Sequence, residues 1–315
     1  MTDIARKRAA GAGFFAAALV VAVAAVAGPM LASGAADSSP SAAAQPAEKR
    51  KHRRPTPTPT PMALPPEIKA KVPAYKPGPI PFHDGEQLVF QGSWIGIPAA
   101  QARIEFHRQK QKDPQRWLGE IWIETNKFTD IFYKMRDYMK ESVAEDTLHT
   151  NGVYLIQHEK SRLNTYDVKI DRTAKLVTVT KKNRKGVTTD KEYIASDPWG
   201  PISGAMMALT QDFAPGKTYA FDVFSGSQRY VFAFVVDKRE KIHLALGDFD
   251  AWRIVPDVWY VSDGSLRSEA HDTVLWISAD QRHLPLRIET QTYIGSARAD
   301  LIQIDGKGGT QSAGK

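Results

Sequence analysis

Apolar and polar residues alternate along most of the chain beyond residue 82. Successive side chains of a β-strand point to opposite faces, so this period of two predicts strands with one buried and one solvated face. The clearest runs place Ala102, Ile104 and Phe106, then Tyr166, Val168 and Ile170, then Leu286 and Ile288 on the apolar side. Most of this region is therefore predicted to be β-sheet.

Two segments, 230–236 and 274–277, are apolar at nearly every position, and we expect these strands to be covered on both faces. Short Gly-containing pairs separate the apolar runs and mark turns. These pairs are Asn151-Gly152, Lys185-Gly186, Pro215-Gly216, Ser225-Gly226, Gly247-Asp248 and Asp263-Gly264. About a dozen strands result from this division.

Two segments depart from the alternation. Residues 127–135 fit a helical turn or a short helix, and residues 199–211 fit a longer helix with Ile202, Met206 and Leu209 on one face. A single sheet with so many strands has to curl or close to hide its apolar face and its edges. We therefore predict a mainly β domain. It would be a large curved antiparallel sheet or incomplete β-barrel with one or two short helices, the longer of which plugs one side.

The first 36 residues have the pattern of an export signal. Arg6, Lys7 and Arg8 form a short basic segment, and residues 9–36 carry no charge. Small residues before Asp37 suit cleavage by signal peptidase, but the uncharged run is longer than the about 20 residues that span a bilayer. Residues 1–36 are therefore either a cleaved signal peptide, which releases the protein into the periplasm, or a signal anchor, with residues 9–36 in the inner membrane.

Residues 37–82 are rich in Ala, Ser, Pro and basic side chains, with too little apolar surface to compensate for chain ordering. We expect a disordered linker, stiffened from Pro55 to Pro61 by a polyproline II segment. The basic cluster at residues 48–54 is either a solvated tail or a contact for anionic membrane lipid or wall polymer. With a disordered tail at residues 306–315, the folded domain would span residues 83–305.

The charge distribution argues against nucleic acid as a partner of the folded domain. The chain has 42 Lys or Arg and 35 Asp or Glu, and 11 and 4 of these lie in residues 1–82, which leaves 31 of each. The net charge of +7 thus belongs to the leader and linker. A charge-balanced domain lacks the basic stripe that binds phosphate backbones.

The sequence contains no catalytic or metal-binding motif, and we expect neither an enzymatic activity nor a cofactor. It has no cysteine, which excludes disulfides, thiol nucleophiles and a lipid-modified N-terminal cysteine. No two histidines lie at i, i+2 or i, i+4, so a metal site would need residues from distant parts of the chain. Ser203 lacks the Gly-x-Ser-x-Gly elbow of a hydrolase and is expected to be a helix-start hydroxyl. Glu120 and Glu124 share a strand face, as many solvated carboxylates do.

The chain is rich in aromatic residues, with 7 Trp, 13 Phe and 10 Tyr. Such side chains either fill a core or line a cavity, because each one buries a large apolar area. For a cavity in this sheet, we predict a lining that includes Trp94, Trp122, Trp199 and Met206. The helix that follows Trp199 would then act as its lid or plug.

Four stretches together resemble the bacterial domain-of-unknown-function family 3108, whose members are exported proteins. They are Gly85–Ala100, Ile131–Asp137, Gly247–Pro256 and Trp276–Glu289. The resemblance covers most of residues 83–305 and implies an exported, mainly β domain without an established enzymatic activity. The segment from Asp197 to Leu209 departs from the family pattern, because it lacks the Tyr and Arg expected near the end of the central helix.

These observations predict a non-enzymatic periplasmic protein of the cell envelope. Its curved sheet would bind a hydrophobic or lipid-like ligand or an envelope protein. The alternative is a structural or interaction protein that is tethered between envelope layers by the basic linker. A hydrolase of envelope polymers is a third possibility, and it would need ionisable groups that converge in a cleft.

Overall fold

A computed structural model of the chain describes residues 72–109, 115–194, 196–226, 228–262, 265–268, 272–291, 295–306 and 311–312. The expected leader at residues 1–36, the basic cluster at residues 48–54 and the Pro-Thr repeat lie outside these residues. The turn expected at Asp263-Gly264 also lies outside them.

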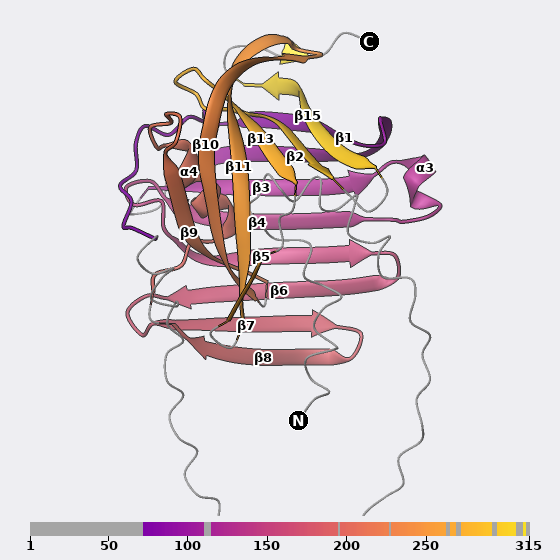
Figure 1. Ribbon diagram of the computed structural model, residues 1–315. Helices are drawn as coiled ribbons and strands as arrows, with labels where there is room; N and C mark the ends of the chain where they lie inside the picture. Colours follow the sequence, from indigo (N-terminus) through magenta and orange to yellow (C-terminus); the bar gives the residue numbers. More distant parts are fainter. Residues whose placement is uncertain are drawn as a thin grey trace, which may run out of the picture.

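The described strands form one 16-stranded antiparallel sheet (Figure 1). Its strand order is β8-β7-β6-β5-β4-β3-β2-β1-β15-β14-β13-β11-β10-β9, with β12 paired to β11 and β16 to β15. The strands are β1 (Glu86–Trp94), β2 (Ile97–Gln109), β3 (Arg116–Thr125), β4 (Arg136–Ala144), β5 (Thr150–Glu159), β6 (Arg162–Asp171), β7 (Leu176–Asn183), β8 (Gly186–Tyr193), β9 (Thr218–Ser225), β10 (Gln228–Leu244), β11 (Gly247–Ser262), β12 (Ser265–Ser268), β13 (Thr273–Ser278), β14 (Pro285–Gln291), β15 (Ser296–Asp305) and β16 (Gln311–Ser312). The sheet is not closed, because β8 and β9 stand at its two ends. The predicted fold class is confirmed, with more strands than expected.

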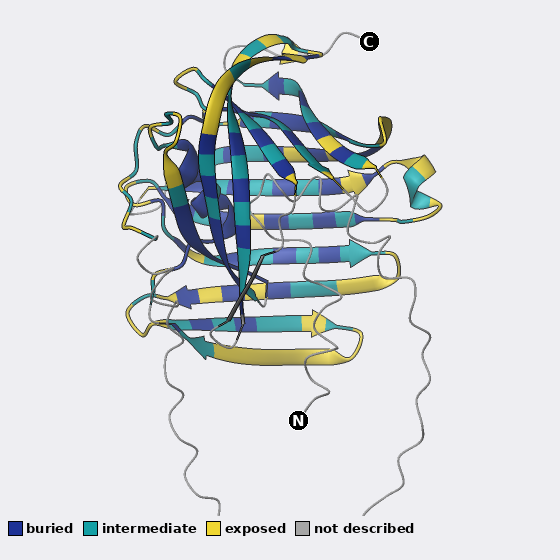
Figure 2. Cartoon of the chain, viewed as in Figure 1, coloured by how far each residue is buried: buried dark blue, intermediate teal, exposed yellow. Residues whose placement is uncertain are grey.

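The sheet folds over on itself. In Figure 1, β9, β10 and β11 cross in front of β3 to β6, and the helix α4 lies between the two layers. Register shifts interrupt the pairing within β1, β10 and β13. Such bulges bend a strand and increase its twist, which lets one sheet supply both layers. Figure 2 shows the buried residues on these strands and on α4.

The predicted alternation is confirmed in the strands from which it was inferred. Ala102, Ile104 and Phe106 of β2 are buried, as are Leu286 and Ile288 of β14. The expected turn at Asn151-Gly152 is wrong, since both residues belong to β5, where Gly152 pairs with Lys169 of β6. A Cβ at Gly152 would lie 2.3 Å from the Val168 carbonyl oxygen, so this glycine permits close strand approach instead of a turn.

The two helices of the described chain differ in burial. The helix α3 (Lys127–Asp130) buries none of its residues, whereas α4 (Pro201–Leu209) buries eight of its nine. Ile202, Met206 and Leu209 are all buried, as their spacing predicts. Neither helix has the length and apolar character needed to cross a membrane.

The chain joins the domain earlier than the expected start at His83. Residues 72–82 form an extended segment, called the strap below, that lies along β9 and the C-terminal end of α4. Tyr75 stacks on Phe221 at 4.5 Å and its hydroxyl accepts a hydrogen bond from the Ala220 amide at 2.9 Å. Phe82 stacks on Phe106 at 3.9 Å. Ile80 and Val72 also pack against the domain. Four apolar side chains of this Pro-rich segment therefore anchor residues that composition alone indicates to be linker.

The two edges of the sheet differ. The Trp199 amide donates to the Asp222 carbonyl at 2.7 Å and the Phe224 amide donates to the Trp199 carbonyl at 2.8 Å, so Trp199 covers part of the β9 edge. β8 is exposed along most of its length. Near the C-terminus, β16 lies within residues 306–315, which the sequence predicts to be a disordered tail. It pairs with Gln303 and Ile304 of β15.

Gly119 of β3 lets α4 approach the sheet, because a Cβ there would lie 2.6 Å from Cγ2 of Ile202. We expect Gly119→Ala to lower the free energy of unfolding by about 1–3 kcal/mol, as overpacking of a core does. Chemical denaturation of the two proteins measures this difference. Gly306→Ala is the matched control, since the nearest atom to its added Cβ would lie at an ordinary 3.7 Å.

A double-mutant cycle locates the effect at the helix. Ile202→Ala removes the clashing methyl group, so Gly119→Ala should cost less in that background than in the natural sequence. Equal costs in both backgrounds would contradict the proposed contact.

Candidate functional site

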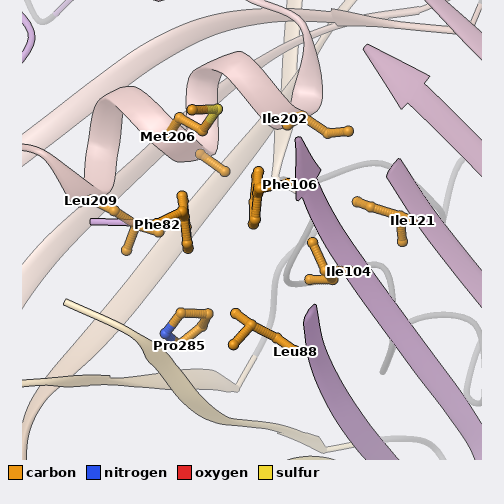
Figure 3. A pocket seen from close by; sticks show the side chains of 10 residues that line it. Phe82, Leu88, Ile104, Phe106, Ile121, Ile202, Met206, Leu209 and Pro285 are labelled. Atoms are coloured by element: carbon orange, nitrogen blue, oxygen red, sulfur yellow. The ribbon is translucent and has the colours of Figure 1, made fainter. Parts of the chain in front are cut away.

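An apolar pocket lies between α4 and the concave face of the sheet (Figure 3). Ile202, Met206 and Leu209 reach into it from α4, and Ala205 completes the helical side. The sheet and the strap supply the opposite wall with Phe82, Leu88, Ile104, Phe106, Ile121 and Pro285. Every lining side chain is apolar, so the pocket offers contacts to hydrocarbon and no side-chain hydrogen bond.

The pocket is small as it stands. The space open to the centre of a water molecule is about 20 Å³, which is enough for one water molecule. An apolar cavity of this kind has no polar partners to retain water. A lipid chain would fit only if α4 moved away from the sheet.

The N-terminus of α4 is held by a buried carboxylate. Glu141 of β4 accepts hydrogen bonds from the amides of Ile202 at 2.8 Å and Ser203 at 3.1 Å, and it is 1% exposed. These amides are among the unpaired donors of the first helical turn, where a negative charge is stabilised. A Cβ at Gly200 would lie 2.3 Å from Oε1 of Glu141, so only glycine admits the carboxylate here.

Burial raises the pKa of the Glu141 carboxyl to about 7, and the hydrogen bonds from Ser203 and Ile202 oppose this rise. The group therefore changes its protonation state near neutral pH. A carboxylate that binds helix amides becomes a neutral acid with weaker acceptor strength as the pH falls.

Further ion pairs fix the segment that leads from β8 to α4. Arg172 contacts Asp197 at 2.6 Å, and the His149 ring lies 3.5 Å from the same carboxylate. Beside them, Arg229 and Asp222 form a buried pair with contacts at 2.7 and 2.8 Å, joined by the Ser196 hydroxyl. Breaking a buried pair of this kind leaves an uncompensated charge, so the entry to α4 is rigidly placed.

The structure distributes the four predicted lining residues over different surroundings. Met206 lines the pocket. Trp199 is 7% exposed, precedes α4 and lies 4.6 Å from the His149 ring. Trp122 lies on the outer face of β3 beneath the Arg103 guanidinium, 4.2 Å from the ring centre, and Trp94 lies at the end of β1. The pocket thus brings only Met206 into contact with its interior, and a role of the four residues in binding a ligand stays a prediction.

Ser203 is engaged at the start of α4. It is fully buried, and its hydroxyl accepts a hydrogen bond from the Gly200 amide at 2.9 Å and donates to the Gly200 carbonyl at 3.3 Å. These bonds match the helix-start role expected from the sequence.

One cluster with metal-ligand potential was not predicted. Glu105 and His107 of β2 lie beside Glu120 of β3, with possible ligand atoms all within 4.8 Å of one another. Glu105 contacts Arg103 at 3.3 Å and accepts a hydrogen bond from Gln87 at 2.5 Å, and Glu120 accepts one from Tyr138. The i, i+2 spacing of Glu105 and His107 on a strand was the available signal. Because its carboxylates already have partners, the cluster is explained as a hydrogen-bonded patch on the solvated face.

Comparisons with known proteins agree with the resemblance found in the sequence. A family model described as a protein of unknown function, DUF3108, matches residues 89–302. The comparison with curated proteins found no match.

Three solved structures are similar to this chain. A β-barrel-like protein of the domain of unknown function DUF1849 from Brucella abortus has 12% sequence identity and a TM-score of 0.47, over 70% of this chain and 97% of that one. A protein from Bacteroides fragilis, named as exported and with a YmcC-like fold, has 9% identity and a TM-score of 0.28, over 74% and 99%. A protein from Parabacteroides distasonis, named as a lipoprotein, has 11% identity and a TM-score of 0.31, over 74% and 100%.

The raised pKa of Glu141 predicts how stability varies with pH. Between the ordinary value of 4.5 and the folded value of about 7, the folded state binds more protons than the unfolded state. The stabilising contribution is therefore complete below about pH 4.5 and is lost as the pH rises through 7. Glu141→Gln should remove up to about 3 kcal/mol of this pH dependence. Denaturation curves at pH 5, 6, 7 and 8 for both proteins measure the difference.

Asp137 provides a second, separable contribution, because burial also raises the pKa of its carboxyl to about 7. The double variant Asp137→Asn, Glu141→Gln should show a smaller change of unfolding free energy with pH than Glu141→Gln alone. Parallel pH profiles for the natural protein and Glu141→Gln would show that Glu141 does not titrate in this range.

Proposed function

This chain belongs to the DUF3108 family, and we propose that it is a non-enzymatic protein of the bacterial cell envelope that binds a hydrophobic, lipid-like ligand beneath α4. The observation that carries the proposal is the entirely apolar pocket between the helix and the sheet. A ligand without polar groups gains most from such a lining, because its binding free energy comes from removing apolar surface from water.

Access to the pocket would require α4 to move. Glu141 attaches the N-terminus of this short helix to β4, and His283 donates a hydrogen bond to the Leu209 carbonyl at 2.9 Å at its C-terminal end, so displacement requires both attachments to break. Displacing it would uncover the apolar side chains of Leu88, Ile104, Phe106 and Ile121 on β1, β2 and β3. A ligand that covers these side chains would favour the displaced state by its differential affinity for that state.

The engaged state of the polar residues supports a binding role over catalysis. Ser203, Glu105 and Glu120 all have hydrogen-bond partners within the domain, and none of them lines the pocket. A hydrolase of envelope polymers would need such groups to converge on a cleft.

The envelope location is proposed from the leader pattern of residues 1–36 and the basic linker behind it. The protein would either be released into the periplasm or be held in the inner membrane by residues 9–36. N-terminal sequencing of the mature protein distinguishes these states. A start near Asp37 shows release, and an intact leader shows anchoring.

Ligand binding is tested in cells fed with a fatty acid that carries a photoreactive diazirine. After irradiation of the full chain, we expect cross-linked peptides from β2 and α4, which include Phe106 and Met206. Ala205→Leu fills the pocket with three additional carbons and should reduce this cross-linking about fivefold or more, since a loss of about 1 kcal/mol suffices. Trp122→Phe, on the outer face of β3, is the matched control and should leave it unchanged.

Cross-links confined to residues 1–36 would contradict the ligand proposal, because the leader can meet membrane lipid without any pocket. Equal cross-linking of β2 and α4 in the Ala205→Leu protein would also contradict it.

A further inference from the structure

The exposed large apolar residues of the described chain gather at one end of the sheet. Ile95 lies in the β1–β2 turn and Ile97 begins β2, while Phe128, Ile131 and Phe132 lie in the connection from β3 to β4 that contains α3. The two remaining ones, Leu163 and Val187, follow the β5–β6 and β7–β8 turns. We call these seven residues the apolar rim.

The strand register places the four connections side by side. The Asn126 amide donates to the Ala99 carbonyl at 2.9 Å, which joins α3 to the β1–β2 turn. Met135 pairs with Glu159, which joins the β3–β4 connection to the β5–β6 turn. Thr165 of β6 pairs with Lys182 of β7, so the β7–β8 turn follows next. Figure 1 shows these connections along one end of β1 to β8, with α4 toward the other end.

The rim residues are held in water by the fold. Ile131 is 74% exposed, and Phe128 and Phe132 are 60% and 63% exposed. Ile95 has a φ of 50°, a conformation in which a β-branched residue is strained and Gly or Asn would cost less. Turn formation therefore does not explain an isoleucine at this tip.

The same connections carry a surplus of positive charge. Residues 126–134, 159–163 and 181–187 contain eight Lys or Arg and two Asp or Glu. The two acidic groups have partners, since Asp130 contacts Arg136 at 2.6 Å and Glu159 accepts a hydrogen bond from Tyr133 at 2.8 Å. Because residues 83–315 as a whole have equal numbers of acidic and basic side chains, this surplus is local to the rim.

We propose that the apolar rim docks on the surface of an anionic phospholipid bilayer. Apolar side chains at the tips would enter the boundary between headgroups and acyl chains, while the surrounding Lys and Arg side chains contact lipid phosphates. A protein partner fits less well, because protein interfaces are depleted in Lys and the apolar groups here are distributed over four separate connections and the strand ends beside them. The docking surface is distinct from the pocket beneath α4, and the inference does not depend on a ligand there.

The chain has no cysteine, so single labels can report on the rim in the full-length protein. Ile131→Cys carries a polarity-sensitive fluorophore at the rim, and Ala174→Cys carries it in the exposed β6–β7 turn at the opposite end. With vesicles of phosphatidylglycerol and phosphatidylcholine, we expect a blue shift and quenching by lipid-attached spin labels at residue 131 only. Vesicles of phosphatidylcholine alone should produce a signal about tenfold weaker, given the contribution of each basic residue near an anionic surface.

Charge reversal tests the same contact. Lys182→Glu, Arg184→Glu and Lys185→Glu together should weaken the signal at residue 131 at least about tenfold, since each basic residue contributes about fivefold. The matched control reverses three exposed lysines outside the rim, Lys169→Glu, Lys191→Glu and Lys241→Glu, and should have a much smaller effect. Replacing Phe128 and Phe132 by Ser should abolish the blue shift without loss of folding, because both side chains are exposed.

Three results would overturn the proposal. The label at residue 131 could stay in water as the label at residue 174 does, or it could respond equally to neutral and anionic vesicles. It could also become protected without vesicles as the protein concentration rises, which would assign the rim to a contact between two copies of this chain. In either of the first two cases the pocket proposal would be unaffected, because its cross-links are mapped on β2 and α4.

Discussion

The fold depends on covering one continuous apolar face. Between β1 and β15, the inward side chains of most strands form one large hydrophobic cluster, and in the described part of the chain the sheet itself, α4 and the strap cover it. The sheet covers this face by folding over, and α4 fills the space that two strongly twisted layers leave between them. Gly119 and Gly200 then become necessary, since the helix meets β3 and Glu141 at distances that exclude a side chain.

The two ends of the sheet have different chemistry as a consequence. Toward the β4–β5 turn, buried polar groups such as Glu141 and the Arg229–Asp222 pair fix α4 and its approach, and their desolvation requires well-formed partners. Toward the opposite end, apolar side chains remain in water and basic groups surround them. The buried polar contacts stabilise the fold at the first end. Exposed apolar surface, as at the second end, is typical of a site that interacts with a partner or a membrane.

The sequence predicts the strands and α4 well because both follow periodic burial, and the alternation around Ile104 is visible without any tertiary information. The same period shows that Trp122, between the buried Ile121 and Ile123, faces outward. Glu141 shares the apolar side of β4 with Met139 and Val143, which was a signal for a buried carboxylate. The Pro-rich composition of residues 72–82 indicates a linker, so the sequence did not predict that the strap packs on the domain. The apolar rim forms because the register of the strands brings four connections together, and register cannot be derived from composition.

The strap has a mechanical consequence. Force applied to the chain ahead of residue 72 first loads the packing of Val72 against Ala220 and Val231, and then the contacts of Tyr75 with Phe221 and Ala220 at the β9 edge. The next contacts along the load path are the hydrogen bond from Gln211 to the Lys76 carbonyl, at the end of α4, and then the stack of Phe82 on Phe106. Under tension, the contacts at the β9 edge and at the end of α4 would therefore break first, and the contact of Phe82 in the pocket wall would break last. Attached in this way, the domain resists pulling through the same residues that enclose its apolar interior.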